Sequence, residues 1–129
     1  MNEKTVLEFI DRINARDVEG IIRFLSDDHV FIDAQGNEFK GKDRLRKGWA
    51  EYFVLFPDYN IAVEDILLKE NLVVVFGYAS ATYKGFTADP TNYWRLPAAW
   101  KGLTGKEKIK LRQVYADYAL ISEIIEKNK

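Results

Sequence analysis

The apolar residues near the N-terminus repeat at the spacing of amphipathic helices. The first set shares one helical face at i, i+3, i+4 and i+7 and consists of Val6, Phe9, Ile10 and Ile13. Thr5 and Glu8 form a capping-box pair around the start of this set, so we predict a helix over residues 5 to 16. Asp17 follows, and its side chain can accept hydrogen bonds from the free amides of a second short helix that ends near Ser26.

A third helix is predicted to begin at Asp43 and to end before Pro57. Proline lacks the amide donor that a helix interior needs, and it disfavours a helical conformation in the residue before it. The apolar face of this helix is rich in aromatic side chains and consists of Leu45, Trp49, Tyr52, Phe53 and Phe56. Before this helix, residues 29 to 34 and 38 to 40 can pair as two short strands around the turn Gln35-Gly36-Asn37.

The hydrophobic pattern changes to a period of two after Pro57. Residues 59 to 67 and 72 to 83 predict one long β-hairpin, and residues 93 to 118 predict a second one that turns near Gly105. The loop between the hairpins, residues 84 to 92, is long enough to border a pocket. Pro97 cannot donate to a strand ladder, which indicates a bulge or an edge position there.

These elements predict a single α+β domain over residues 1 to 129. Consecutive strands joined by tight turns pair antiparallel, and the helices then cover one face of the sheet. We expect a strongly curved, cone-shaped antiparallel sheet wrapped over three N-terminal helices, with a short C-terminal helix over residues 120 to 127. A sheet bent in this way leaves a cavity between itself and the helices.

Composition and charge exclude several classes of function. The chain has 129 residues, no Cys and a formal net charge of −1, which disfavours thiol chemistry and binding to a nucleic-acid backbone. His29 is the only histidine and directly follows two aspartates, so we predict a surface position for it and no metal site. No apolar run is long enough for a membrane helix. We therefore expect a cytoplasmic protein without metal or organic cofactor, and no binding to nucleic acid or membrane.

Three stretches of the chain resemble a known superfamily. Asn14-Ala15-Arg16-Asp17-Val18-Glu19-Gly20-Ile21, with Asp33 further on, is similar to the opening of nuclear transport factor 2-like proteins, which include the ketosteroid isomerases. Pro97-Ala98-Ala99-Trp100 and Gln113-Val114-Tyr115-Ala116-Asp117 resemble the last two strands of the SnoaL-like polyketide cyclases of that superfamily. The resemblance implies a conical pocket and a dimer formed through the outer face of the sheet. It is more specific for fold than for function, because this scaffold hosts several chemistries as well as binding modules.

Two aspartates match catalytic positions of the superfamily. The resemblance assigns Asp33 to the general base of the isomerases and Asp117 to the acid–base residue of the cyclases. Each has a structural alternative, since Asp33 can cap the Gln35-Gly36 turn and Asp117 can cap the C-terminal helix. The isomerase oxyanion hole is not matched, because Phe9 and Ala98 stand where its Tyr and Asp are expected. Steroid isomerisation is therefore not expected.

The last strand predicts a polar surface inside the cavity. Gln113, Tyr115 and Asp117 alternate along one strand face. The apolar Ile109 and Leu111 extend the same face, which favours an inward orientation. We therefore expect Tyr115 to reach the same buried volume as the aspartates.

Aromatic residues make up 14% of the chain and supply candidate ligand contacts. Most are expected in the core, but Tyr and Trp carry polar ends and can line a pocket for a planar apolar molecule. Together with one amide on the last strand, the candidate ligand-binding residues are Trp49, Tyr52, Trp100 and Gln113. Arg95 and Arg112 fall on the opposite strand parity and are expected on the outer surface, which disfavours the Asp-Arg-Asp site of epoxide hydrolases.

The sequence therefore favours a SnoaL-like enzyme that uses cofactor-free acid–base chemistry on an apolar carbonyl-containing substrate, with Asp33, Asp117 and Tyr115 as catalytic candidates. A non-catalytic ligand-binding or dimerisation module of the same fold is the alternative, and its carboxylates would face bulk water. We also expect a homodimer, because outer sheet positions such as Val74 and Phe76 would otherwise expose apolar area.

Overall fold

The helices predicted from apolar spacing are present in the computed structural model, which describes residues 1–129. They are α1 (Glu3–Asn14), α2 (Val18–Ile22), α3 (Lys42–Leu55) and α4 (Ala119–Lys127). α1 begins before the predicted cap, because the Asn2 side chain accepts the Thr5 amide at 2.9 Å. Asp17 caps α2 as predicted, through the Gly20 amide at 2.9 Å. None of these helices combines the length and the apolar character that crossing a membrane requires.

Six strands form one sheet in the order β2-β1-β6-β5-β4-β3. They are β1 (Leu25–Ile32), β2 (Glu38–Lys40), β3 (Asn60–Lys69), β4 (Leu72–Thr82), β5 (Tyr93–Gly105) and β6 (Lys108–Ala116). The two predicted hairpins are antiparallel, but β1 pairs with β6 in parallel. The predicted curved sheet is present, but it is mixed rather than antiparallel throughout, because tight turns determine the direction only of strands that are neighbours in sequence.

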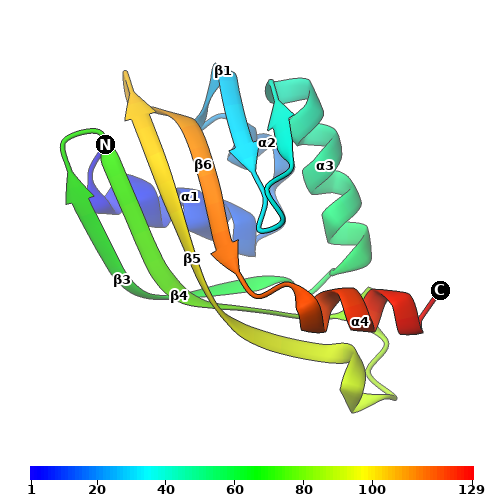
Figure 1. Cartoon of the computed structure of the whole chain (residues 1–129). Helices are drawn as coiled ribbons and strands as arrows, with labels where there is room; N and C mark the ends of the chain where they lie inside the picture. The colour runs from blue at the N-terminus through cyan, green and yellow to red at the C-terminus, as the bar shows by residue number, and fades with distance from the viewer.

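The sheet curves around the helices (Figure 1). α1 and α2 lie behind the sheet, α3 runs beside β1 and β2, and α4 crosses the end where β6 finishes. The pairing of β3 with β4 shifts between Val63 and Asp65, and a Cβ on Gly77 of β4 would collide with the Ala62 carbonyl, so the two strands approach closely where they bend. Pro97 lies at an edge, as predicted, because β6 pairs with β5 only from Ala98 onward.

The main core lies between α1, α2 and the sheet. All four apolar residues of the predicted α1 face are buried: Val6, Phe9, Ile10 and Ile13. Asn14 ties the end of α1 to β3, since its side chain donates to the Ile61 carbonyl at 3.0 Å and accepts the Ile61 amide at 2.8 Å. A second cluster under α4 includes Phe56, Trp94 and Ile121. The fold thus has two apolar clusters under one curved sheet.

His29 is buried, so the prediction of a surface position is wrong. The side chain is 1% exposed, and its Nδ1 donates to the Ile109 carbonyl oxygen at 2.7 Å. β1 begins at Leu25 rather than at His29, which places His29 inside a strand that pairs with β6. Burial is the main reason why the pKa of His29 lies below its usual value. The neutral ring is therefore the form that the folded protein prefers.

We predict that His29 makes the protein sensitive to mild acid. Because its folded-state pKa lies below the unfolded value of 6.5, its contribution is complete above that pH and is lost as the pH falls. His29→Gln can still donate to Ile109 but cannot titrate. Urea unfolding should therefore show that the variant is less stable at about pH 8 but loses less free energy of unfolding between about pH 7 and pH 5.

The pH range in which stability is lost distinguishes His29 from the carboxylates. Hydrogen bonds lower the pKa of Asp17 and of Asp89 below 3.8, so their contributions are lost only at pH values below the histidine window. An equal loss of unfolding free energy in the wild type and in His29→Gln between about pH 7 and pH 5 would contradict the prediction.

Candidate functional site

A cavity of about 390 Å³ opens between α3, the inner face of β4 to β6 and the start of α4. Its floor includes three small inward-facing side chains, Ala79, Ala98 and Ala116, beside larger ones such as Trp94 and Leu96. Ala98 and Ala116 are direct neighbours across β5 and β6, so no large side chain fills the space where the sheet bends. The aromatic face of α3 forms the opposite wall, and Leu45 is its only fully buried residue. Sixteen of the 22 lining residues are hydrophobic, so the cavity suits a largely apolar molecule.

Arg112 is a buried cation at this cavity and has no partner. The residue is 3% exposed, and its Nε makes no hydrogen bond. Its Cζ lies 5.0 Å from the ring centre of Trp100, 5.5 Å from that of Phe31 and 5.8 Å from that of Trp49. Burial lowers the pKa of Arg112 to about 10, so the guanidinium is still charged at neutral pH. An uncompensated positive charge therefore borders an apolar cavity.

The prediction that Arg112 lies on the outer surface is wrong, because β6 contains a bulge. Leu111 and Ile109 pair with consecutive residues of β5, which leaves Lys110 without a partner across the strands. One extra residue reverses which side chains of the strand point inward. The apolar residues of β6 carry a sign of this shift, since they move from odd positions at Ile109 to an even position at Val114.

The same bulge turns the predicted polar face outward. Tyr115 is 49% exposed, Gln113 lies on the same outer face, and neither lines the cavity. Asp117 is exposed beyond the end of β6 and accepts the Ala119 amide at 3.0 Å, which is the structural alternative considered for it. Trp100 points inward, but it is 5% exposed within the core and does not line the cavity. The expectation that these four residues reach the cavity is therefore wrong.

Three predicted residues do meet at the cavity: Asp33, Trp49 and Tyr52. Asp33 comes from the turn after β1, and its Oδ1 accepts the Gln35 and Asn37 amides, each at 2.9 Å. Its Oδ2 accepts the Asn37 side-chain amide at 3.2 Å. Asp33 thus caps the turn, as its structural alternative requires, and also faces the cavity.

Three tyrosines share the cavity with Asp33 and Arg112, and they are Tyr52, Tyr59 and Tyr118. Burial raises the pKa of each hydroxyl, most strongly for Tyr52, so all three are protonated donors at neutral pH. The charge of Asp33 further raises the pKa of Tyr118. Sequence reasoning missed Tyr59 and Tyr118 because strand alternation does not show which aromatic residues border a cavity. No three side chains from His, Cys, Asp and Glu come together as a metal site.

The comparison with known proteins identifies the family. The SnoaL-like domain family matches residues 6–101. The chain belongs to this family. A SnoaL-like protein from Shewanella denitrificans has a similar structure, with a TM-score of 0.81 and 14% identity over 97% of this chain and 96% of that chain. None of the curated proteins is a significant match.

Two further solved structures of similar fold contain a small molecule. A protein from Catenulispora acidiphila with a ketosteroid isomerase-like fold, in complex with trimethylamine, has a TM-score of 0.78 and 15% identity over 89% of this chain and 86% of that chain. TerC, co-crystallised with polyporic acid, has a TM-score of 0.79 and 18% identity over 95% of this chain and 96% of that chain. At such identities the likeness shows the fold alone. The family match ends before β6, so it does not include Arg112.

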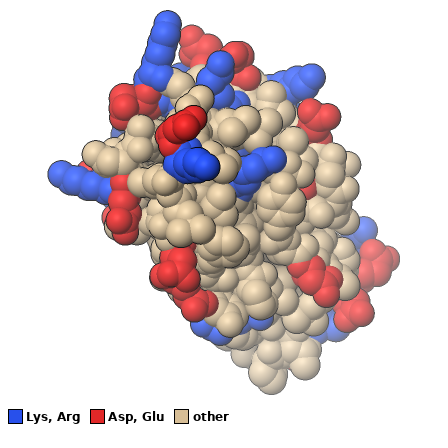
Figure 2. All heavy atoms as spheres, turned by 60° about the vertical axis from the view of Figure 1, so that its left-hand side comes forward, with Lys and Arg blue, Asp and Glu red and all other residues tan.

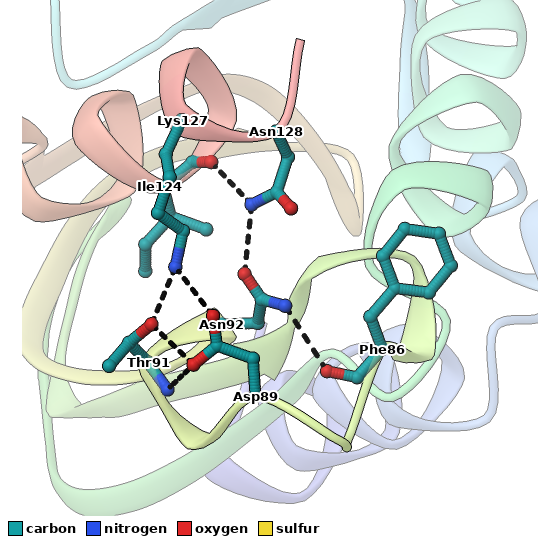
Figure 3. Close-up of polar contacts among 7 residues, drawn as sticks. All are labelled: Phe86, Asp89, Thr91, Asn92, Ile124, Lys127 and Asn128. Carbon is teal, nitrogen blue, oxygen red and sulfur yellow. Dashed lines mark hydrogen bonds and ion pairs between the residues drawn. The ribbon is translucent and has the colours of Figure 1, made fainter.

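The loop between β4 and β5 does not border the cavity of this SnoaL-like chain, contrary to the prediction. Instead it holds α4, as Figure 3 shows. Lys127 donates to Thr91 Oγ1 at 2.5 Å, and the Asn128 side chain donates to Asn92 Oδ1 at 2.8 Å. α4 carries Ile121, which lines the cavity. The loop therefore acts on the cavity indirectly, through the helix that closes one end of it.

We predict that filling the cavity stabilises the SnoaL-like fold. Ala116→Phe adds a ring that contacts apolar walls, which should raise the free energy of unfolding by about 0.5–2 kcal/mol. The same change should abolish the fluorescence gain of the neutral probe N-phenyl-1-naphthylamine. Ala50→Phe on the exposed side of α3 is the control and should leave probe binding unchanged, because Ala50 does not line the cavity. A destabilised Ala116→Phe that binds the probe like the wild type would contradict the prediction.

Proposed function

We propose that the chain binds a small, largely apolar carbonyl compound in the cavity and transfers a proton on it without a cofactor. The observation that carries this proposal is that the Asp33 carboxylate opens on the same apolar cavity as protonated tyrosine hydroxyls, with Tyr118 within its electrostatic influence. Proton transfer beside a carbonyl needs a base for the proton on carbon and a donor for the oxygen that becomes negative. Asp33 and the tyrosines supply one of each.

The proposed step balances without an outside reagent. Asp33 takes a proton from the carbon next to the carbonyl, and the electron pair of that C–H bond moves to give an enolate. A tyrosine hydroxyl donates a hydrogen bond to the enolate oxygen. If a C=C bond is conjugated with the enolate, protonated Asp33 then returns the proton to the far end of that bond, which gives an isomer. In a saturated ketone it returns a proton to the same carbon, and the result is exchange with solvent. Asp33 Oδ2 accepts only the Asn37 side chain, so it keeps a lone pair for the substrate proton.

Asp117 and Tyr115 take no part in this proposal, because they lie outside the cavity. A ligand-binding protein without catalysis is the second candidate, and one observation favours it. All three hydrogen bonds to the Asp33 carboxylate come from its own turn, from Gln35 and Asn37, and they hold that turn whether or not Asp33 performs chemistry. The two candidates therefore differ in what happens to a bound carbonyl compound, rather than in whether it binds.

We predict that the wild-type protein accelerates the exchange of the α-protons of 1-tetralone with solvent deuterium, followed by NMR. Asp33→Asn should reduce the rate at least about 100-fold, because general-base catalysis contributes about 10²–10⁴. Its amide also preserves most of the turn hydrogen bonds. Asp117→Asn is the matched control and should exchange at the wild-type rate. Binding of 1-tetralone without accelerated exchange would overturn the catalytic proposal in favour of the binding protein.

We also propose that two copies of the chain pair through the outer face of the sheet. Phe76, Ala99 and Tyr115 are neighbours across β4, β5 and β6 on that face. Phe76 is 44% exposed and Tyr115 is 49% exposed, so this row presents apolar area to solvent. Figure 2 shows one side of the molecule on which uncharged surface extends through the middle and the charged side chains gather mainly above it and along its edges. Pairing would remove such area from water.

We predict that light scattering gives a mass of twice the 15.0 kDa chain at micromolar concentration. Tyr115→Lys should return the mass to that of one chain, because a lysine charge would be buried in the interface. Leu120→Lys on α4 is the control and should leave the dimer intact, since this leucine is comparably exposed but lies away from the sheet. A single-chain mass at every concentration would contradict the prediction.

A further inference from the structure

Arg112 is buried and forms no ion pair, although the carboxylates of Asp33 and Glu51 line the same cavity. Its neighbours are aromatic faces on one side, including those of Trp100 and Phe9, and the cavity on the other. The ion pairs of the chain are formed by other groups, such as Arg46 with Glu19. Moving a cation out of water is costly unless it gains an ionic partner, and buried polar groups without partners are rare in native proteins. The uncompensated charge therefore calls for a partner from outside the chain.

The surroundings of Arg112 limit what that partner can be. Arg112 is the buried basic group at the cavity, whereas Arg44 at its rim is exposed and lies over the Phe39 ring, so one buried negative charge balances the interior of the site. A guanidinium matches the two oxygens of a carboxylate, which it can bind with parallel hydrogen bonds. Tyr52 and Tyr59 lie near enough to raise the pKa of Arg112, and their hydroxyls can donate to the same oxygens. A monocarboxylate fits this set of donors.

The walls of the cavity limit the rest of the ligand. The indole of Trp49 and the ring of Tyr52 meet edge to face at 6.2 Å, and both line the cavity. A volume of about 390 Å³ lies within the range of small-molecule sites. Flat aromatic groups pack well against such rings. A polar sugar or a peptide would leave its own hydrogen-bonding groups unpaired there.

We propose that the cavity binds a small aromatic monocarboxylate, whose carboxylate pairs with Arg112 and whose rings lie against the aromatic face of α3. This inference uses the same cavity as the proposed function and names the class of its ligand. It does not require Asp33 to transfer a proton, so the two proposals can fail separately.

The test compares two probes of nearly equal shape, 2-naphthoate and its neutral amide 2-naphthamide, titrated calorimetrically at neutral pH. The wild type should bind the acid at least tenfold more tightly than the amide. Arg112→Met should bind both with similar affinity, because its apolar side chain keeps the volume but removes the charge. Arg95→Met is the matched control and should keep the wild-type preference, since Arg95 lies on the ring of Tyr78 on the outer face at 3.9 Å.

A stability measurement separates a ligand partner from a structural arginine. If Arg112 is paired only when a ligand is bound, Arg112→Met should melt at a higher Tm than the free wild type, by about 4 °C or more, because it removes an unpaired buried charge. Saturating 2-naphthoate should raise the Tm of the wild type but not that of Arg112→Met. Arg112→Lys keeps the charge, and it should retain a reduced preference for the acid.

Several results would overturn the inference. They are equal binding of the two probes by the wild type, no binding of either probe, an unchanged acid preference in Arg112→Met, and a lower Tm of Arg112→Met than of the free wild type. The 1-tetralone exchange assay is independent of all of them. A strong acid preference without proton exchange supports the aromatic carboxylate and rejects the catalytic step. Proton exchange without a preference for the acid supports the catalytic step and rejects the aromatic carboxylate.

Discussion

The bend of the sheet is the constraint on which the cavity, the helices and the charged site all depend. Where β4 and β5 are covered by α1 and α2, large side chains such as Phe9 and Trp100 fill the space completely. Farther along, the sheet curves away and alanines face inward, so open space remains between the sheet and Trp49 and Tyr52 of α3. Irregular pairing in β3 and a glycine at the close approach to Ala62 accompany that curvature. The curvature of the backbone therefore leaves a cavity beside a core that is packed at ordinary density.

His29 and Arg112 are both buried basic residues, but they differ in whether they carry a charge in the folded protein. His29 can be neutral, and the Ile109 carbonyl accepts its proton at 2.7 Å, so its burial leaves no net charge in the core. Arg112 cannot lose its charge at neutral pH, and aromatic faces compensate only part of its lost hydration. Residues that serve a binding site often lower the stability of the free protein. The contrast explains why we connect Arg112, rather than His29, with function.

Membership of the SnoaL-like family establishes the scaffold and leaves the chemistry to individual residues. The family resemblance points to Asp33 and to Asp117, but only Asp33 faces the cavity. Asp117 instead accepts a backbone amide at the start of α4, beside the tyrosine that enters the cavity. The loop of Asp89 and Asn92 holds the other end of that helix. Asp117, a catalytic candidate in the sequence, thus helps to hold the helix that borders the cavity.

Local patterns in the sequence determined much of the fold. The spacing of apolar residues predicted α1 and α3, Asp17 was correctly predicted as the cap of α2, and Pro57 marked the end of α3. The two hairpins and the edge position of Pro97 were also predictable. These features depend on contacts between residues close in the chain, or on the backbone chemistry of a single residue. Trp49 and Tyr52 were found as cavity residues from the aromatic face of α3, whereas Asp33 was found through the family resemblance.

Only the tertiary structure decided the rest of the site. The parallel pairing of β1 with β6 joins segments that are far apart in sequence, and it buries His29. The bulge at Lys110 depends on how β6 aligns with β5, and a single unpaired residue exchanges the inner and outer faces of the strand. For that reason Arg112 lies inside while Gln113 and Tyr115 lie outside. Alternation along a strand shows which residues share a face, but the register with its neighbour decides which face meets the cavity.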